Sequence, residues 1–261
     1  MSVPPPVLVG VSLKMYFGHR EALDWIRRAV GLASAHVGVR SGDVGVFLIP
    51  GYLAVVEAAD AAAGTPVLIG AQDVAASEPG PFTGEVSAAE LAEVGVRVAE
   101  IGHAERRRLF GENDAVVAAK TASALRHRVT PVLCVGESEP GDADAAIAAT
   151  RRQVRAALAD APRGAVVLAY EPVWAIGAAE PAPDAHIRAV CAALRADLAG
   201  DPARAGSSVI YGGSAGPGLL TRLGDDVDGL FLGRFAHDPA ALTAVLDEAT
   251  ALAAGRKAAG G

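Results

Sequence analysis

The chain has 261 residues, of which 51% are hydrophobic and 20% are charged, and this is the composition of a globular protein with a sizeable core. The length permits one large domain, and no shift in composition along the chain marks a boundary. The formal net charge of -7 excludes the global positive field that proteins use to hold nucleic acid or anionic membranes.

The N-terminal sequence MSVPPPVLVG has no basic stretch followed by an apolar one, so it predicts no secretory signal. No apolar run is long enough to span a bilayer. Cys134 and Cys191 stand in apolar or helical contexts, without the spacing of metal ligands or of a disulfide framework. We therefore expect a cytoplasmic protein that uses no cofactor and no metal.

Eight short apolar runs, rich in β-branched residues, alternate with longer amphipathic stretches. We predict strands over 7–12, 44–49, 67–71, 96–101, 129–135, 166–170, 208–211 and 229–232. Helical periodicity covers 21–35, 113–127, 143–158, 184–198 and 240–253. This alternation indicates parallel βαβ units. About eight such units in this length favour an α/β fold closed into a (β/α)8 TIM barrel over an open sheet.

The predicted barrel is one domain over residues 1–261, and two segments fall outside its pattern. Residues 72–87 form a long stretch without periodicity, and loops of this length in compact domains are usually functional or form an interface. Residues 254–261 are rich in Ala and Gly, so we expect this tail to fray.

In parallel barrels the active site lies at the carboxyl ends of the strands, which makes polar residues there the candidates. Lys14 follows the first predicted strand directly, where a cation is costly unless it faces an anion or water. Taken alone, it is more typical of a strand-end lysine whose head group reaches water.

The fourth and sixth predicted strands end in titratable residues. His103 stands where a short helix can begin, and the N–H groups of that helix would favour a neutral imidazole that can hydrogen-bond a carbonyl. Glu171 ends an apolar run and precedes a Gly/Ala-rich stretch that can form a mobile lid, so partial burial would raise its basicity. A surface histidine and an ion-paired glutamate are the alternatives that these residues leave open.

Glycine-rich turns follow the last two predicted strands, with YGGS at 211–214 and LGR at 232–234. Turns at these two places commonly bind phosphate through backbone N–H groups, although any tight turn uses glycine. Together the strand ends place a cation, an imidazole, a carboxylate and a phosphate-binding turn around one barrel mouth. This set suits proton abstraction beside a carbonyl on a phosphorylated substrate.

The segments IGHAERR, CVGE, AYEPVWAIG, YGGS and DGLFLG occur in the order that they have in triosephosphate isomerases, and the chain resembles that family over nearly its whole length. PFTGE is similar to the third loop through which the family forms dimers. The resemblance implies a homodimer, and it implies that Thr83 reaches the active site of the neighbouring subunit.

The resemblance also implies roles for individual residues. Glu171 would be the base, His103 would polarise the carbonyl, and Lys14, held by Glu105, would stabilise the enediolate and the phosphate. Substrate or phosphate binding would fall to Ser12, Gly177, Gly212, Gly213, Ser214, Gly233 and Arg234. Around them, Ile176 and Phe231 would form an apolar clamp over Glu171, and Tyr211 would latch the closed lid near Ala182.

Four positions depart from the family pattern. Ser12 stands where an Asn is usual, which exchanges an amide for a shorter hydroxyl with one donor hydrogen. Ala104 replaces a Ser that can dock the base in the open state, and Arg234 replaces a Gly beside the phosphate. The lid reads GAAEP at 177–181 in place of a Thr-Gly-Lys tip, which stiffens its hinge and reverses its charge.

Three hypotheses follow. The intact motif set favours an isomerase that interconverts glyceraldehyde 3-phosphate and dihydroxyacetone phosphate, a reaction of glycolysis and gluconeogenesis. Ser12 and the altered lid favour the same enediol chemistry on a four-carbon ketose phosphate, erythrulose phosphate. The third hypothesis is a catalytically silent relative that only binds a phosphorylated metabolite. The retention of Lys14, His103 and Glu171 together argues against it.

Overall fold

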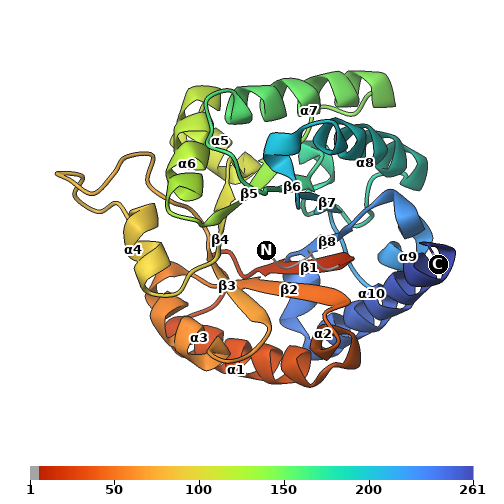
Figure 1. Cartoon of the computed structure of the whole chain (residues 1–261), viewed down its shortest axis with the longest axis horizontal. Coiled ribbons are helices and arrows are strands. Elements are labelled where there is room, and N and C mark those ends of the chain that lie inside the picture. Colours follow the sequence, from red (N-terminus) through yellow and green to blue (C-terminus); the bar gives the residue numbers. More distant parts are fainter. Residues whose placement is uncertain (1–5, 261) are drawn as a thin grey trace.

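Parallel strands close into a barrel in sequence order in this computed structural model, which describes residues 6–260 (Figure 1). The strands are β1 (Val7–Ser12), β2 (Val44–Ile49), β3 (Val67–Ala71), β4 (Val98–Ile101), β5 (Thr130–Val135), β6 (Val167–Tyr170), β7 (Ser208–Tyr211) and β8 (Gly229–Leu232). The structure confirms the predicted (β/α)8 barrel. β4, β5 and β6 begin one or two residues later than predicted, and the other strands match their predicted bounds.

Helices form a ring around the strands (Figure 1). They are α1 (His19–Ala35), α2 (Val37–Arg40), α3 (Val55–Ala62), α4 (Ala88–Glu93), α5 (Ala104–Phe110), α6 (Asp114–Arg126), α7 (Ala143–Leu158), α8 (Asp184–Ala199), α9 (Leu219–Leu223) and α10 (Pro239–Gly260). The helical periodicity covered none of α2, α3, α4, α5 and α9, which are too short to show it over several turns. Across residues 6–260, no helix combines the length and the apolar character needed to cross a bilayer.

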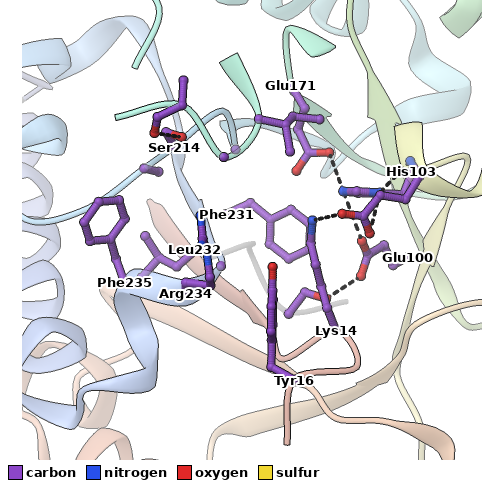
Figure 2. A pocket seen from close by; sticks show the side chains of 18 of the residues that line it. Lys14, Tyr16, Glu100, His103, Glu171, Ser214, Phe231, Leu232, Arg234 and Phe235 are labelled. Atoms are coloured by element: carbon purple, nitrogen blue, oxygen red, sulfur yellow. Dashed lines mark hydrogen bonds and ion pairs between the residues drawn. The ribbon is translucent and has the colours of Figure 1, made fainter. Parts of the chain in front are cut away.

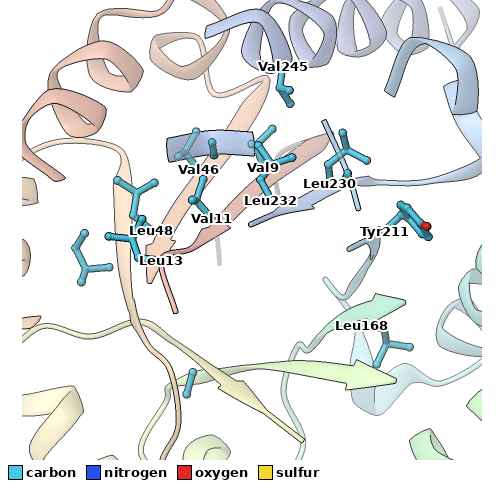
Figure 3. Packing of buried hydrophobic residues seen from close by; sticks show 14 of the residues in the cluster. Val9, Val11, Leu13, Val46, Leu48, Leu168, Tyr211, Leu230, Leu232 and Val245 are labelled. Atoms are coloured by element: carbon cyan, nitrogen blue, oxygen red, sulfur yellow. The ribbon is translucent and has the colours of Figure 1, made fainter. Parts of the chain in front are cut away.

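Alternation along the strands divides the core into two layers. One set of strand side chains packs outward against the helices, including Val9, Val11, Leu48 and Leu232, with Val245 of α10 among them (Figure 3). The intervening residues point into the barrel and fill its lumen with a separate cluster that includes Phe47, Ile49, Val98, Val132, Ile210 and Phe231. Because side chains alternate with a period of two, the same rule decides which polar residues enter the lumen.

The C-terminal helix extends into the tail for which fraying is predicted. α10 continues through residue 260. Arg256 anchors its last turns, because the guanidinium donates to the carbonyl oxygens of Pro6 and Val227 and pairs with Asp225. The Ala- and Gly-rich composition favours fraying of these turns, whereas the contacts of Arg256 with residues distant in the sequence stabilise them. Residue 261 lies outside the described residues.

The predicted loop over 72–87 has no helix or strand and projects from the barrel next to α4 (Figure 1). A backbone hydrogen bond of 2.8 Å from Ala75 N to Val86 O closes its base. Thr83 lies in the exposed part of this loop.

Candidate active site

A pocket of about 660 Å³ opens at the carboxyl end of the barrel. Figure 2 shows Lys14, His103 and Glu171 converging on one side of it, with Ser214 and Phe235 on the other. Its lining contains most of the residues that the sequence nominated, namely Ser12, Lys14, His103, Glu105, Glu171, Ile176, Gly177, Gly212, Ser214, Phe231, Gly233 and Arg234. Closure of the barrel therefore brings side chains from the carboxyl ends of strands early and late in the chain into one cavity.

Lys14 is held in a strained conformation two residues beyond β1. Its φ of 47° lies in the left-handed region, which a non-glycine residue adopts at a cost. The side chain of Gln72 donates to the Lys14 carbonyl oxygen at 2.7 Å, and Lys14 Nζ donates to Glu105 Oε1 at 2.8 Å. Burial alone would lower the pKa of Lys14, but the contact with Glu105 and the charge of Glu171 outweigh burial and raise it. The ammonium therefore stays charged inside the pocket.

His103 caps the N-terminus of α5 with its side chain. The backbone N–H of Glu105 donates to His103 Nδ1 at 3.1 Å, so the neutral ring carries its proton on Nε2. Burial and the neighbouring Lys14 cation lower the pKa of His103 to about 4. The imidazole is thus neutral at neutral pH, with an Nε2–H donor that faces Glu100 and Glu171 at 3.9 and 3.5 Å.

Glu171 follows the outward-facing Tyr170, so the period of two turns its carboxylate into the lumen. There it packs on Gly212, where any Cβ would collide with it. In the described part of the chain, Glu171 Oε2 is buried without a hydrogen-bond partner. Burial, with a further contribution from the charge of Glu100, raises the pKa of Glu171 to about 8. An unsolvated carboxylate of this kind is a strong proton acceptor.

Glu100 is a lumen residue to which the sequence interpretation gave no role. It lies in β4 at 3% exposure and accepts a hydrogen bond of 2.7 Å from Ser12 Oγ of β1. Burial raises the pKa of Glu100 to about 7, although the Ser12 hydrogen bond opposes the shift. A carboxylate inside the buried run VAEI was the available signal. Its partner, 88 positions away, was not visible in the sequence.

A lid over residues 176–183 covers one side of the pocket between the 3-10 turn η2 (Val173–Ala175) and α8. The Ala182 N–H donates to the Tyr211 hydroxyl at 3.0 Å. The Ser214 hydroxyl lies 2.9 Å from the carbonyl oxygens of Ala175 and Ala178, so it can donate to either. Ile176 and Phe231 both line the pocket beside Glu171.

The turns after β7 and β8, together with Gly177 of the lid, present backbone N–H groups without an acceptor. No acceptor within residues 6–260 occupies the backbone N–H groups of Gly177, Ser214 or Gly233. The Arg234 guanidinium lies 6.0 Å from the ring centroid of Tyr16, and both side chains line the pocket (Figure 2). Arg234 forms no ion pair with the rest of the described chain. Open N–H groups with one unpaired cation suit a phosphate dianion.

Three of the nominated residues differ from their expected phosphate- or substrate-binding roles, and two of them, Gly213 and Thr83, lie outside the pocket lining. The Gly212 N–H already donates to Tyr170 O at 2.9 Å, so what Gly212 provides is space for Glu171. Gly213 lies behind the pocket lining, where a Cβ would come 2.6 Å from the Tyr211 hydroxyl. Thr83 is exposed on the projecting loop and does not line the pocket of its own chain.

Comparison with known proteins gives a consistent result. The family model described as triosephosphate isomerase matches residues 7–249. L-erythrulose-1-phosphate isomerase of Pectobacterium atrosepticum is 51% identical, with 94% of this chain and 96% of that protein covered. Triosephosphate isomerase of Roseiflexus castenholzii is 38% identical, over 87% of this chain and 91% of that protein.

A solved structure, triosephosphate isomerase from Bartonella henselae, superimposes with a TM-score of 0.78 at 25% identity, covering 93% of this chain and 98% of that one. The match extends over the barrel and over the strand ends that build the pocket. The chain therefore belongs to the triosephosphate isomerase family, and it is an isomerase.

Proposed function

We propose that this protein interconverts L-erythrulose 1-phosphate and its isomeric ketose phosphate by moving the carbonyl between adjacent carbons. The 51% identity to an L-erythrulose-1-phosphate isomerase, against 38% to a triosephosphate isomerase, carries the choice of substrate. Triose-phosphate isomerisation, the first expectation from the sequence, is the second candidate, because the residues for the shared chemistry are all present.

In the proposed reaction, Glu171 removes the proton from the hydroxyl-bearing carbon next to the carbonyl and returns it to the neighbouring carbon. The Nε2–H of His103 hydrogen-bonds the carbonyl oxygen and moves the proton between the two oxygens of the enediolate. Lys14 stabilises the negative charge that develops on these oxygens. The base lies 3.5 Å from the imidazole, so one substrate can contact both groups. The reaction needs no cofactor and no metal.

The phosphate in this proposal binds at the turns after β7 and β8, under the lid. The open N–H groups of Gly177, Ser214 and Gly233 support this assignment, and the Arg234 guanidinium supplies a cation beside them. Ser214 and Arg234 lie across the pocket from Glu171 and His103 (Figure 2). A substrate anchored there presents its far carbons to the base.

The extra hydroxymethyl group of a tetrulose would lie beside Ser12. A serine is shorter than the asparagine usual in the family, so it leaves room next to Lys14. Its hydroxyl donates to Glu100, which leaves the Ser12 oxygen and the second Glu100 oxygen free to accept from a substrate hydroxyl. The pocket therefore offers both the space and the acceptors that a fourth carbon requires.

Turnover tests this proposal directly. The purified protein is assayed with L-erythrulose 1-phosphate and with glyceraldehyde 3-phosphate, and incorporation of deuterium from D2O into product reports the proton transfer. We expect a higher kcat/KM for the tetrulose, and loss of exchange in Glu171→Gln by about 10² to 10⁴-fold. A preference for the triose would favour the second candidate, and no exchange with either substrate would leave only a phosphometabolite-binding protein.

We also propose that two copies form a homodimer through the projecting loop. Met15, Leu53, Leu109 and Phe110 are 95%, 84%, 63% and 67% exposed, and they line a second cavity of about 520 Å³ that adjoins Lys14. A patch of this kind on a single chain indicates an interface. The loop over 72–87 of a second copy, with its exposed Phe82 and Thr83, is the occupant that we propose.

Light scattering tests the dimer. We expect twice the 26.3 kDa mass of the chain at micromolar concentration, and a shift toward single chains in Leu53→Asp. A monomer in the unmodified protein would contradict the proposal. We further propose that the enzyme is cytoplasmic, and fractionation of cells that express it would check this.

A further inference from the structure

Glu137 lies outside the pocket, in the loop after β5, and its carboxylate collects three hydrogen-bond donors. Tyr170 Oη lies 3.1 Å from both carboxylate oxygens, Trp174 Nε1 donates to Oε1 at 2.9 Å, and His186 Nε2 lies 3.2 Å from the same oxygen. Burial and the charge of Glu137 raise the pKa of Tyr170, which keeps its hydroxyl protonated as a donor. The carboxylate is thus tied to three elements at once.

Two of these donors flank the lid. Trp174 belongs to η2, directly before the lid, and His186 lies in the first turn of α8, directly after it. The His186 and Glu137 side chains are only 10% and 9% exposed. The His186 ring also packs edge-on against Trp174, at 6.0 Å between ring centroids and 73° between planes. One buried carboxylate therefore joins the two ends of the segment that must open and close.

The histidine supplies a donor that no cation replaces. No lysine or arginine within residues 6–260 pairs with Glu137, so the His186 contact is not duplicated by a basic side chain. Its Nε2 must hold a hydrogen, because an unprotonated Nε2 would place a lone pair against the carboxylate. Without this donor, the carboxylate could rotate away from Trp174, and the two flanks of the lid would move independently.

We propose that His186 is a positioning residue that fixes Glu137 and, through it, the Trp174 hinge of the lid. This role rests on the proposed isomerase function. His186 itself contacts neither the substrate pocket nor Glu171. Hydrogen bonds to charged groups in buried sites are among the stronger ones in proteins, so losing this donor should shift the balance between closed and open lid by about tenfold.

A side reaction reports lid closure during turnover. The enediolate has one carbon next to the phosphate-bearing carbon and one farther from it. The oxygen on the farther carbon can form a carbonyl, and the double bond then moves between the nearer carbon and the phosphate-bearing carbon. The phosphate then leaves with the electron pair of its C–O bond. A closed lid that holds the phosphate opposes this cleavage. Inorganic phosphate released per isomerisation is a ratio, so the amount of folded enzyme does not affect it.

The test compares His186→Phe, which keeps an aromatic ring without a donor, with His186→Gln, which keeps an N–H donor. Arg188→Ala, a half-exposed position on the same helix, is the matched control. We expect His186→Phe to raise phosphate release per isomerisation about tenfold, and His186→Gln and Arg188→Ala to remain near the unmodified protein. An unchanged ratio in His186→Phe, or an equal rise in His186→Gln, would overturn the proposal.

Hydrogen exchange tests the clamp without any turnover. In the resting enzyme, the lid amides over 176–183, including the Ala182 N–H bonded to Tyr211, should exchange about tenfold faster in His186→Phe than in Arg188→Ala. Equal exchange would count against the clamp. If the unmodified enzyme turned over neither substrate, the proposed function would fail, while this measurement would still decide the role of His186.

Discussion

At the scale of single residues, the basicity of Glu171 depends on its burial and on the charge of Glu100. Glu100 contributes to the raised pKa of Glu171, which is about 8. A base works only when deprotonated, so kcat/KM should fall as the pH drops through that value. Burial is the larger cause of this raised pKa and the charge of Glu100 adds to it, so the two together set the pH range over which Glu171 can act as a base.

We predict that Glu100→Gln moves the acidic limb of the kcat/KM profile to lower pH. The substitution removes a negative charge that disfavours ionisation of Glu171, so the pKa of Glu171 falls. Profiles recorded with one substrate decide this, because ionisation of the substrate phosphate is common to all variants. Exposed Glu21→Gln should leave the limb in place, and an unmoved limb in Glu100→Gln would show that burial alone raises the pKa.

Substrate choice is a second property that we assign to one residue. Ser12→Asn should raise the ratio of triose to tetrulose turnover, because the larger amide fills the space beside Lys14 and competes for Glu100. A change of pocket volume of this size typically shifts specificity by roughly 1–3 kcal/mol, which is about 10 to 200-fold. Ala104→Ser is the control, since position 104 does not line the pocket and should alter both rates in parallel. Values of kcat/KM for both substrates test this, and an unchanged ratio would remove Ser12 from the argument.

The expectation that the active site lies at the carboxyl ends of the strands was sufficient to nominate Lys14, His103 and Glu171. Each stands within two residues of the end of a strand, and the barrel brings those ends together. For two other carboxylates the sequence predicted no role, for different reasons. Glu100 lies inside a strand, and its significance depends on a partner 88 positions away. Glu137 follows β5 within the quoted motif CVGE, but its role depends on donors from β6, η2 and α8. Such pairings are set by tertiary packing, which local patterns do not encode.

At the scale of elements, capping chemistry explains where sequence-based bounds are accurate. Asn113 accepts from Val116 N at the start of α6, and Asp142 accepts from Ala145 N at the start of α7. Side-chain caps of this type are readable in the sequence, and the predicted start of α7 is correct. The C-terminus of α10 has no such signal. Its continuation depends on Arg256, whose acceptors come from Pro6 and Val227.

The anchoring of α10 gives a prediction at this scale. Arg256→Ala removes hydrogen bonds to two carbonyl oxygens and the contact with Asp225, so it should lower the free energy of unfolding by about 1–3 kcal/mol and speed amide exchange in the last turns of the helix. Neighbouring Lys257→Ala removes only an exposed ion pair with Asp43 and should cost less than about 1 kcal/mol. Urea titrations of both variants make the comparison. Equal losses would mean that the hydrogen bonds to the Pro6 and Val227 carbonyl oxygens contribute nothing.

At the scale of the whole molecule, closure of the barrel is what turns separate strand ends into a site. The number and spacing of the β and α segments predicted that closure, and the strand order from β1 to β8 follows it. An apolar cluster fills the middle of the lumen, and the polar side chains of Ser12, Glu100 and Glu171 enter it at the carboxyl end. Burial of these carboxylates lowers the free energy of unfolding, and this loss of stability should be measurable.

We predict that Glu171→Gln stabilises the protein, and increasingly so as the pH rises. The unfolded carboxyl ionises near its ordinary pKa of 4.5, whereas the folded one ionises at about 8, so between these values the folded state binds more protons and stability declines as pH increases. Glutamine carries no charge and escapes this decline. Its Tm should therefore exceed that of the unmodified protein by more at pH 9 than at pH 5, with exposed Glu21→Gln showing no such trend. A Tm difference that is equal at both pH values would mean that the charge of Glu171 is not buried at a cost, and the case for its unusual basicity would fall with it.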